Sequence, residues 1–171
     1  ETGAKNAYLP PDEMVFNWLA SSSPVRRDPS DISTLALYPD PGAKYSRNLE
    51  IDLSTLEPQI ACPHGVDNVQ ALPSVAGRRV NQVFLGTCTN GRLEDIAMAT
   101  QVLQGRKVAS GTRMLVIPAS SQVLQEAIEQ GYIAKLLEAG ATLGTPGCGP
   151  CMGNQMGVLA PGEVCLSTGN R

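Results

Sequence analysis

Cysteines are the side chains in this sequence whose spacing best suits chemistry, and there are five of them. Cys148 and Cys151 form a Cys-x-x-Cys inside the glycine-rich segment PGCGPCMG at 146–153, and Cys88 lies in GTCTNG at 86–91. Two cysteines three positions apart can direct both thiolates toward one centre, and glycines let backbone N–H groups approach the sulfurs. A lone Cys-x-x-Cys also fits a zinc half-site, a redox dithiol or two packed thiols.

Convergence of Cys88 with the Cys-x-x-Cys pair would give a metal centre with an open position. Three thiolates are one ligand short of a closed structural zinc site, and one short of a fully ligated [4Fe–4S] cluster. A cluster held by three cysteines leaves one iron free, and an open metal position is where a substrate hydroxyl can bind. Cys165 could instead complete a zinc site, but it lies in the apolar segment 164–166, where a buried free cysteine is common.

Cys62 and His64, in ACPHG at 61–65, are a further pair of possible metal ligands, although a surface loop is the better interpretation. The sequence has a single histidine, so a Ser-His-Asp triad would have to use His64 and a zinc site would have to be mostly sulfur. An odd number of cysteines without a secretory signal indicates a reducing compartment, and we expect the cytoplasm.

The second half of the chain predicts the elements that would position these cysteines. Strands are predicted at 80–85, 114–117, 141–143 and 164–166, and helices at 92–104, after Ser120 or Ser121, and up to a stop at Gly140. Strands that alternate with amphipathic helices indicate an α/β fold with a mainly parallel sheet and packed helices. Cys88 directly follows a strand, and functional loops lie at the carboxyl ends of such strands.

The first half is less regular. We predict a helix over 8–20 with Asp12 near its N-cap, a loop or linker over 21–47, and a half-buried strand at 49–53. Residues 56–73 are predicted to be irregular. A lobe boundary is expected near 74–79, which divides the chain into a preceding α/β lobe with its linker at 1–75 and a second domain at 76–171.

Composition excludes several classes of protein. The 171 residues are 42% apolar and 17% charged, which is typical of a globular protein. A net charge of −3 without a basic run argues against nucleic-acid binding. No apolar stretch approaches the roughly 20 residues of a membrane-spanning helix. The sequence starts without Met, and we expect it to be a piece of a longer protein.

Three segments resemble motifs of the aconitase superfamily in the same order and spacing. VFLGTCTNGRLED at 83–95 resembles the first cluster-cysteine motif, PGCGPC at 146–151 the second, and LSTGNR at 166–171 the substrate-binding motif that follows. The sequence resembles in particular the archaeal-type large-subunit branch shared by 3-isopropylmalate dehydratase and homoaconitase. The likeness covers nearly the whole chain and is least clear over 21–47.

The resemblance implies both a fold and a site. It implies an aconitase-like α/β/α iron–sulfur domain over 76–171, with a smaller, irregular N-terminal α/β lobe. It also implies a [4Fe–4S] cluster on Cys88, Cys148 and Cys151, with one iron not ligated by the protein.

The resemblance also implies groups around the cluster. Asn170 and Arg171 match positions that hold the cluster environment and a substrate carboxylate, a pairing that suits a guanidinium. Glu1 matches an active-site acid near the open iron. Further acidic and histidine residues upstream, and a Ser and an Arg from a separate small subunit, would complete the site.

The activity implied is that of a hydro-lyase of leucine biosynthesis, which interconverts 2-isopropylmalate and 3-isopropylmalate by removing and re-adding water. Homoaconitase or another aconitase-like dehydratase is the alternative enzyme, and a zinc or dithiol structural module is the non-enzymatic alternative. The expected partners are a small subunit and a di- or tricarboxylic hydroxy acid, with no nucleic acid and no membrane. We expect the chain by itself to be inactive.

Overall fold

A computed structural model of the chain describes residues 5–22, 28–153 and 155–169. The chain divides into two compact units, Glu1–Leu56 and Glu57–Arg171. The predicted division into an N-terminal lobe at 1–75 and an iron–sulfur domain at 76–171 stays a prediction. None of the described helices is long and apolar enough to cross a membrane.

The described residues of the first unit form two short α-helices and one 3-10 turn: α1 (Glu13–Ser22), α2 (Pro29–Ser33) and η1 (Leu53–Thr55). The predicted first helix is confirmed as α1, and the Asp12 carboxylate accepts a hydrogen bond of 3.0 Å from the Val15 N–H at its start. Helix α2 lies within the segment predicted as a loop. None of the described residues of α1 or α2 is buried.

The strand predicted at 49–53 is wrong. Residues 49–52 are irregular, and the Asp52 carboxylate caps η1 by accepting hydrogen bonds from the backbone N–H and the hydroxyl of Ser54. An alternating segment becomes a strand only when another strand accepts its backbone hydrogen bonds, and the described part of this unit contains none.

The second unit begins with a hairpin in the segment predicted to be irregular, so that prediction is also wrong. Strand β1 (Gln59–Ala61) pairs antiparallel with β2 (Val69–Ala71), and the 3-10 turn η2 (Leu72–Val75) follows. The connecting loop is closed by the Cys62 N–H, which donates to the Asn68 carbonyl at 2.8 Å. These two strands are only three residues long, which is too short for an alternating pattern to stand out in the sequence.

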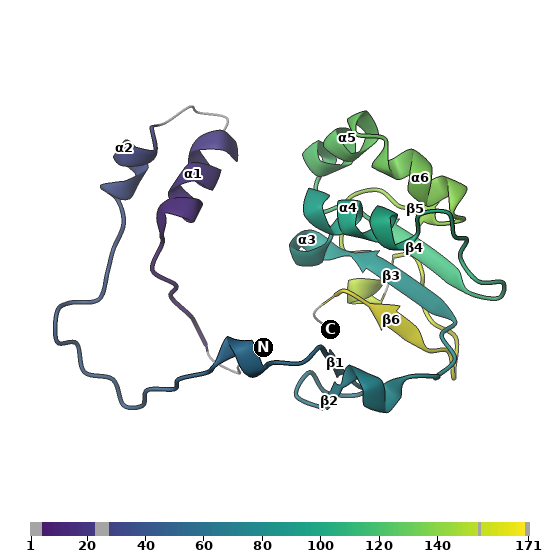
Figure 1. The fold of residues 1–171 in the computed structure, drawn as a ribbon, viewed down its shortest axis with the longest axis horizontal. Coiled ribbons are helices and arrows are strands. Elements are labelled where there is room, and N and C mark those ends of the chain that lie inside the picture. The colour runs from purple at the N-terminus through teal and green to yellow at the C-terminus, as the bar shows by residue number, and fades with distance from the viewer. Residues whose placement is uncertain (1–4, 23–27, 154, 170–171) are drawn as a thin grey trace. The chain divides into compact units, whose positions relative to one another are not determined.

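The rest of the second unit is a parallel α/β arrangement, as predicted (Figure 1). Its elements are β3 (Gln82–Gly86), α3 (Thr87–Asn90), α4 (Leu93–Val102), β4 (Arg113–Ile117), α5 (Ser121–Glu129), α6 (Tyr132–Glu138), β5 (Thr142–Leu143), η3 (Gly149–Met152) and β6 (Cys165–Ser167). The four strands lie in the order β5-β4-β3-β6, and every neighbouring pair is parallel.

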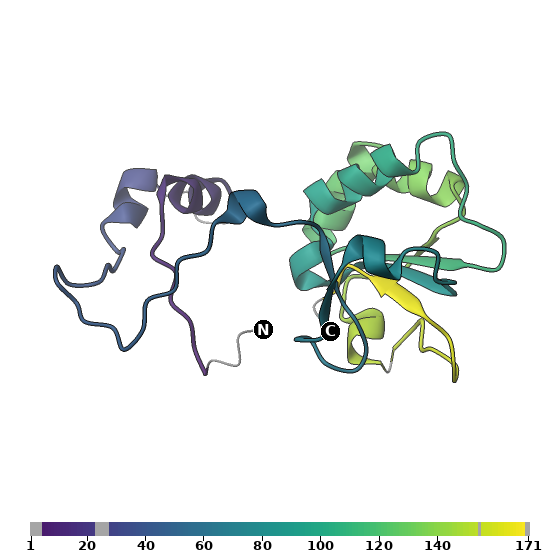
Figure 2. The ribbon, with the colours of Figure 1, turned by 60° about the horizontal axis from the view of Figure 1, so that its bottom comes forward.

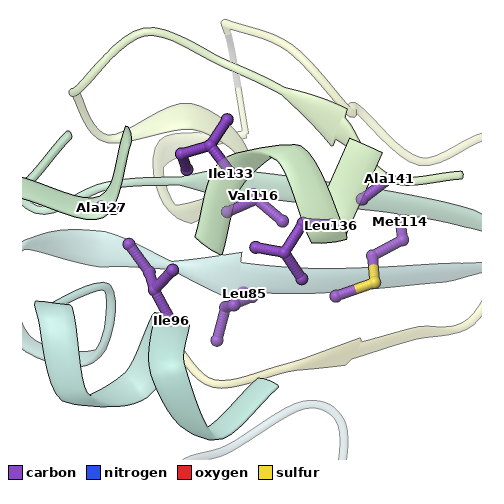
Figure 3. Close-up of a cluster of buried hydrophobic side chains, with 8 residues drawn as sticks. All are labelled: Leu85, Ile96, Met114, Val116, Ala127, Ile133, Leu136 and Ala141. Atoms are coloured by element: carbon purple, nitrogen blue, oxygen red, sulfur yellow. The ribbon is translucent and has the colours of Figure 1, made fainter. Parts of the chain in front are cut away.

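Helices α4, α5 and α6 cover one face of this sheet and enclose the main core (Figure 3). The sheet contributes Leu85, Met114 and Val116, and the helices contribute Ile96, Ala127, Ile133 and Leu136. The predicted helix ends are confirmed. The Ser120 hydroxyl accepts from the Val123 N–H, and the Gly140 and Ala141 N–H groups donate to the Leu137 and Leu136 carbonyls, which is the Schellman arrangement.

The opposite face of the sheet carries a smaller apolar cluster of Phe84, Leu115 and Ile117. The connection between β5 and β6, which contains η3, lies on this side of the sheet (Figure 2), and its residues Cys151 and Met156 pack against the cluster. The two faces follow from strand geometry, because alternate side chains of β3 and β4 point in opposite directions. The predicted Cys-x-x-Cys loop therefore lies on the sheet face that the helices leave uncovered.

Candidate metal centre

Cys88 lies just beyond the carboxyl end of β3, in a turn with unusual backbone geometry. Thr87 precedes it with φ +82°, and it is the only non-glycine residue with a positive φ in the described part of the chain. This conformation is strained for a β-branched side chain, and such strain is typical of functional sites. Thr87 is buried, and its Oγ1 accepts from the N–H groups of Thr89 and Asn90, at 3.3 Å each. The sharp turn leaves Cys88 exposed as the second residue of α3.

Cys148 immediately precedes the single turn η3, and Cys151 lies within it, in the loop that follows β5. The Cys151 N–H donates to the Cys148 carbonyl at 3.0 Å, and the Gly149 N–H donates to Gln155 Oε1 at 2.9 Å. Cys148 is exposed, whereas Cys151 is half-buried and packs against the Phe84, Leu115 and Ile117 cluster.

Gly149 explains how closely this loop approaches the sheet. Its φ is +50°, and a Cβ placed on it would lie 2.1 Å from Cδ1 of Ile117. Ile117 is 1% exposed, so its side chain has little free space into which it could move. Only glycine fits both the backbone conformation and the close approach.

The loop is also held at its far end by a polar network. Gln82 is fully buried, accepts from Arg113 Nε at 3.1 Å, and donates to the Gly157 carbonyl at 2.8 Å. Arg113 forms a bidentate pair with Glu163, with both N···O distances 2.7 Å. Hydrogen bonds from Arg113 and from the Ala160 N–H lower the pKa of Glu163 from 4.5 to about 2. These contacts fasten residues 157–163, the returning part of the loop, to the amino ends of β3 and β4.

The predicted cysteine ligands thus come from two loops at the carboxyl edge of one sheet, one after β3 and the other after β5. Thiolates are the ligands of iron–sulfur clusters, in which each cysteine binds a separate iron, so the donor set fits a cluster. Within residues 5–22, 28–153 and 155–169, no three His, Cys, Asp or Glu side chains form a group that could hold a single metal ion. Convergence of the three sulfurs on one cluster stays a prediction.

Cys165 lies at the amino ends of the strands, whereas the predicted ligand Cys88 lies at their carboxyl ends. Cys165 is the first residue of β6 and is in register with Gln82, whereas Cys88 comes after Gly86, at the far end of β3. At about 3.3 Å per strand residue, Gln82 and Gly86 are roughly 13 Å apart. Burial raises the pKa of the Cys165 thiol, and Gln82 Nε2 donates to its sulfur at 3.6 Å. These contacts describe a packed thiol.

The Cys62 and His64 pair belongs to the loop of the β1–β2 hairpin. Cys62 is half-buried and His64 is exposed. The Asn68 N–H donates to the Gly65 carbonyl at 3.1 Å, and its side-chain amide donates to the Pro63 carbonyl at 2.7 Å, so this segment is a hydrogen-bonded turn. Glu1, Asn170 and Arg171 lie outside the described residues, and their predicted roles stay predictions.

A hollow of about 430 Å³ lies away from the cysteines, between the end of α4 and α6. Arg106, Lys107 and Lys135 line it, but Lys107 Nζ donates to the Glu138 carbonyl and Lys135 Nζ lies over the Tyr132 ring. The segment after α4 leads to the start of β4, so the hollow lies at the amino ends of the strands. The predicted cysteine ligands lie at the opposite ends of the strands.

Comparison with known proteins decides the family. The model of the aconitase family (aconitate hydratase) matches residues 1–78 and 70–171, which together include the whole chain. The chain belongs to the aconitase family. Dehydratases of the aconitase family generally use a [4Fe–4S] cluster.

Individual members of the aconitase family are also similar to the chain. It is 64% identical to the homoaconitase large subunit of Thermus thermophilus over 79% of the chain and 32% of that protein. It is 60% identical to the 3-isopropylmalate dehydratase large subunit 1 of Deinococcus radiodurans over 79% of the chain and 31% of that protein. The probable methanogen homoaconitase large subunit of Methanosarcina mazei is 49% identical over all of the chain and 41% of that protein. The matched part of the chain therefore spans between 31% and 41% of the length of these relatives.

Several residues around the site were not found from the sequence. The sequence contains one signal that could have identified Gln82. It is a polar residue in a short apolar strand, and a buried amide needs hydrogen-bond partners. Gln155, Glu163 and Thr168 had no comparable signal, since their partners are far away in the sequence or lie in irregular loops.

Proposed function

We propose that this chain forms the cluster-binding part of the large subunit of a [4Fe–4S]-dependent hydro-lyase that interconverts 2-isopropylmalate and 3-isopropylmalate. The observation that supports this most directly is the topology of the second unit. The two cysteine motifs follow β3 and β5 at the carboxyl ends of one parallel sheet, and β6, which precedes the Asn-Arg motif in the sequence, is a parallel neighbour of β3. Ligands of open α/β sheets bind at this edge.

In this proposal Cys88, Cys148 and Cys151 hold the cluster as thiolates. A bound cluster with one open iron supplies a Lewis acid for the substrate hydroxyl. The packing of Cys151 against Phe84 and Ile117 limits the access of water to that sulfur from the sheet side.

The proposed substrate-binding groups follow β6. We assign a substrate carboxylate to the guanidinium of Arg171, which can donate two parallel hydrogen bonds to it, and we assign the cluster environment to Asn170. Glu1 is the proposed active-site acid. Dehydration removes a proton from the carbon next to a carboxylate and a hydroxide from the neighbouring carbon, and water then adds back across the double bond in the opposite sense. The groups missing from this chain come from elsewhere in the large subunit and from a small subunit.

Homoaconitase is the second candidate, because large subunits with that name are 64% and 49% identical to this chain. Both candidates share the cluster and the reaction type, and they differ in the substrate side chain. The proposal places the enzyme in the cytoplasm, where thiols stay reduced.

The test is to produce the large subunit that contains this chain together with its small subunit and to reconstitute the complex anaerobically with iron and sulfide. We expect equal amounts of bound iron and sulfide, and activity on isopropylmalate above that on homoaconitate and citrate. Higher activity on homoaconitate would favour the second candidate. Tightly bound zinc without sulfide would contradict both and favour a zinc module. The 171-residue chain alone is expected to be inactive.

Cysteine variants test the ligand assignment in the same complex. Cys88→Ser, Cys148→Ser and Cys151→Ser should each abolish cluster assembly and activity, because each removes one thiolate. Cys62→Ser and Cys165→Ser are the matched controls and should retain both. Loss of the visible cluster absorption in Cys165→Ser would show that the ligand set is wrong.

A further inference from the structure

Thr168 joins the end of β6 to both ends of the Cys88 turn. Its Oγ1 accepts from the Gly86 N–H at 3.0 Å, and its hydroxyl lies 3.3 Å from the carbonyl oxygens of both Gly86 and Asn90, to either of which it can donate. Its own N–H donates to the Phe84 carbonyl at 3.0 Å, and the Asn90 side-chain amide donates to the Thr168 carbonyl. One side chain therefore bridges the residues immediately before and at the end of α3.

The turn that Thr168 bridges is the strained one. Thr87 holds a positive φ inside this turn, and an unfavourable backbone conformation persists only when surrounding contacts impose it. Thr87 Oγ1 bonds within the turn itself, whereas the Thr168 contacts connect the turn to a different strand. Thr168 thus supplies a tertiary restraint on the position of Cys88.

The same residue stands next to the proposed substrate-binding motif. Gly169 follows it, its N–H donates to Ser167 Oγ at 2.9 Å, and a Cβ on Gly169 would lie 3.1 Å from Cγ2 of Thr87. The chain after β6 therefore leaves the sheet in contact with the Cys88 turn. The Cys88 turn and the segment after β6 are therefore in direct contact.

We propose that Thr168 is a positioning residue that fixes the Cys88 turn relative to the segment leading into Asn170 and Arg171. This inference rests on the proposed function, because it assigns Thr168 the task of holding a cluster ligand and a carboxylate-binding pair at a constant spacing. The hydroxyl is the essential group, since it makes the contacts to Gly86 and Asn90. Serine should replace it, and valine, which has nearly the same shape, should not.

The first measurement does not depend on a cluster. Amide hydrogen exchange of Gly86 is followed by NMR in the 171-residue chain, in the wild type, Thr168→Val and Thr168→Ser. We expect about fivefold faster exchange of the Gly86 N–H in Thr168→Val, the effect of losing one hydrogen bond, and wild-type exchange in Thr168→Ser. Thr112→Val is the matched control, because it removes a threonine hydroxyl that donates to the Val80 carbonyl at the other edge of the sheet. Unchanged Gly86 exchange in Thr168→Val would overturn the inference.

The second measurement uses the reconstituted two-subunit complex. Thr168→Val should shorten the lifetime of the cluster's visible absorption in air and raise KM for the hydroxy acid, and Thr168→Ser should restore both. Asn90→Ala, which releases the Thr168 carbonyl, serves if Thr168→Val does not fold, and it should also shorten the cluster lifetime. A Thr168→Val complex with wild-type cluster lifetime and KM would overturn the positioning role while leaving the proposed function standing. A wild-type complex that takes up no cluster would instead overturn the proposed function, and the positioning role with it.

Discussion

Gly149→Ala tests whether the Cys-x-x-Cys loop really is seated on the sheet. An L-residue in the left-handed region costs about 1–2 kcal/mol. The new Cβ would also lie 2.1 Å from Cδ1 of Ile117, and overpacking of a filled core costs about 1–3 kcal/mol. The free energy of unfolding should therefore fall by about 2–5 kcal/mol.

Gly153→Ala is the matched control in the same loop. Its φ is +71°, but a Cβ there has nothing within 4 Å, so only the backbone cost of about 1–2 kcal/mol applies. The difference between the two variants measures the contact of the loop with Ile117. Urea denaturation of the chain, followed by circular dichroism, gives both values, and an unchanged m-value supports a change in stability alone.

Ile117→Val provides the rescue, because it removes the Cδ1 atom that meets the new Cβ. Alone it should cost about 0.5–1.5 kcal/mol. Combined with Gly149→Ala, it should give a loss smaller than the sum of the two single losses, by about 1 kcal/mol or more, as expected for residues in contact. Equal losses in Gly149→Ala and Gly153→Ala, together with additivity of the Ile117→Val double variant, would refute the seating of the loop on the sheet.

Three further variants test other parts of the second unit. The folded-state pKa of Glu163 is lowered to about 2, so its pairing with Arg113 stabilises the fold fully above pH 4.5 and loses this effect as the pH falls toward 2. The stability gap between wild type and Glu163→Gln, measured by urea denaturation at several pH values, should close over that range; a constant gap would contradict it. Ile96→Ala, at a fully buried position, should cost about 2–5 kcal/mol in thermal or urea unfolding, and a loss below 1 kcal/mol would contradict the core assignment. Gln155→Ala should cost about 0.5–1.5 kcal/mol, because the Gly149 N–H loses its acceptor.

The regular part of the fold was predictable because its signals are local. Apolar residues at helical spacing predicted α4, α5 and α6, and Ser120 and Gly140 marked helix ends through hydrogen bonds to residues three positions away. The position of Cys88 just after a strand followed from the change from the apolar segment to GTCTNG. The N-terminal part was harder to predict, because the segment around Asp52 fits either a strand or the N-cap of a helical turn. The sequence does not show whether a partner strand is present, and in the structure Asp52 is an N-cap.

The sequence by itself determined the cysteine motifs, the parallel α/β class and the family, because these depend on residue types and on short-range periodicity. Only the tertiary structure decided which face of the sheet receives the Cys-x-x-Cys loop, where Ile117 meets Gly149. It also decided that Thr168 reaches the Cys88 turn, although the two are separated by most of the second unit. The physical reason is the same in both cases. Each contact depends on the register of parallel strands, and that register is set by the packing of the whole sheet and not by the residues that make the contact.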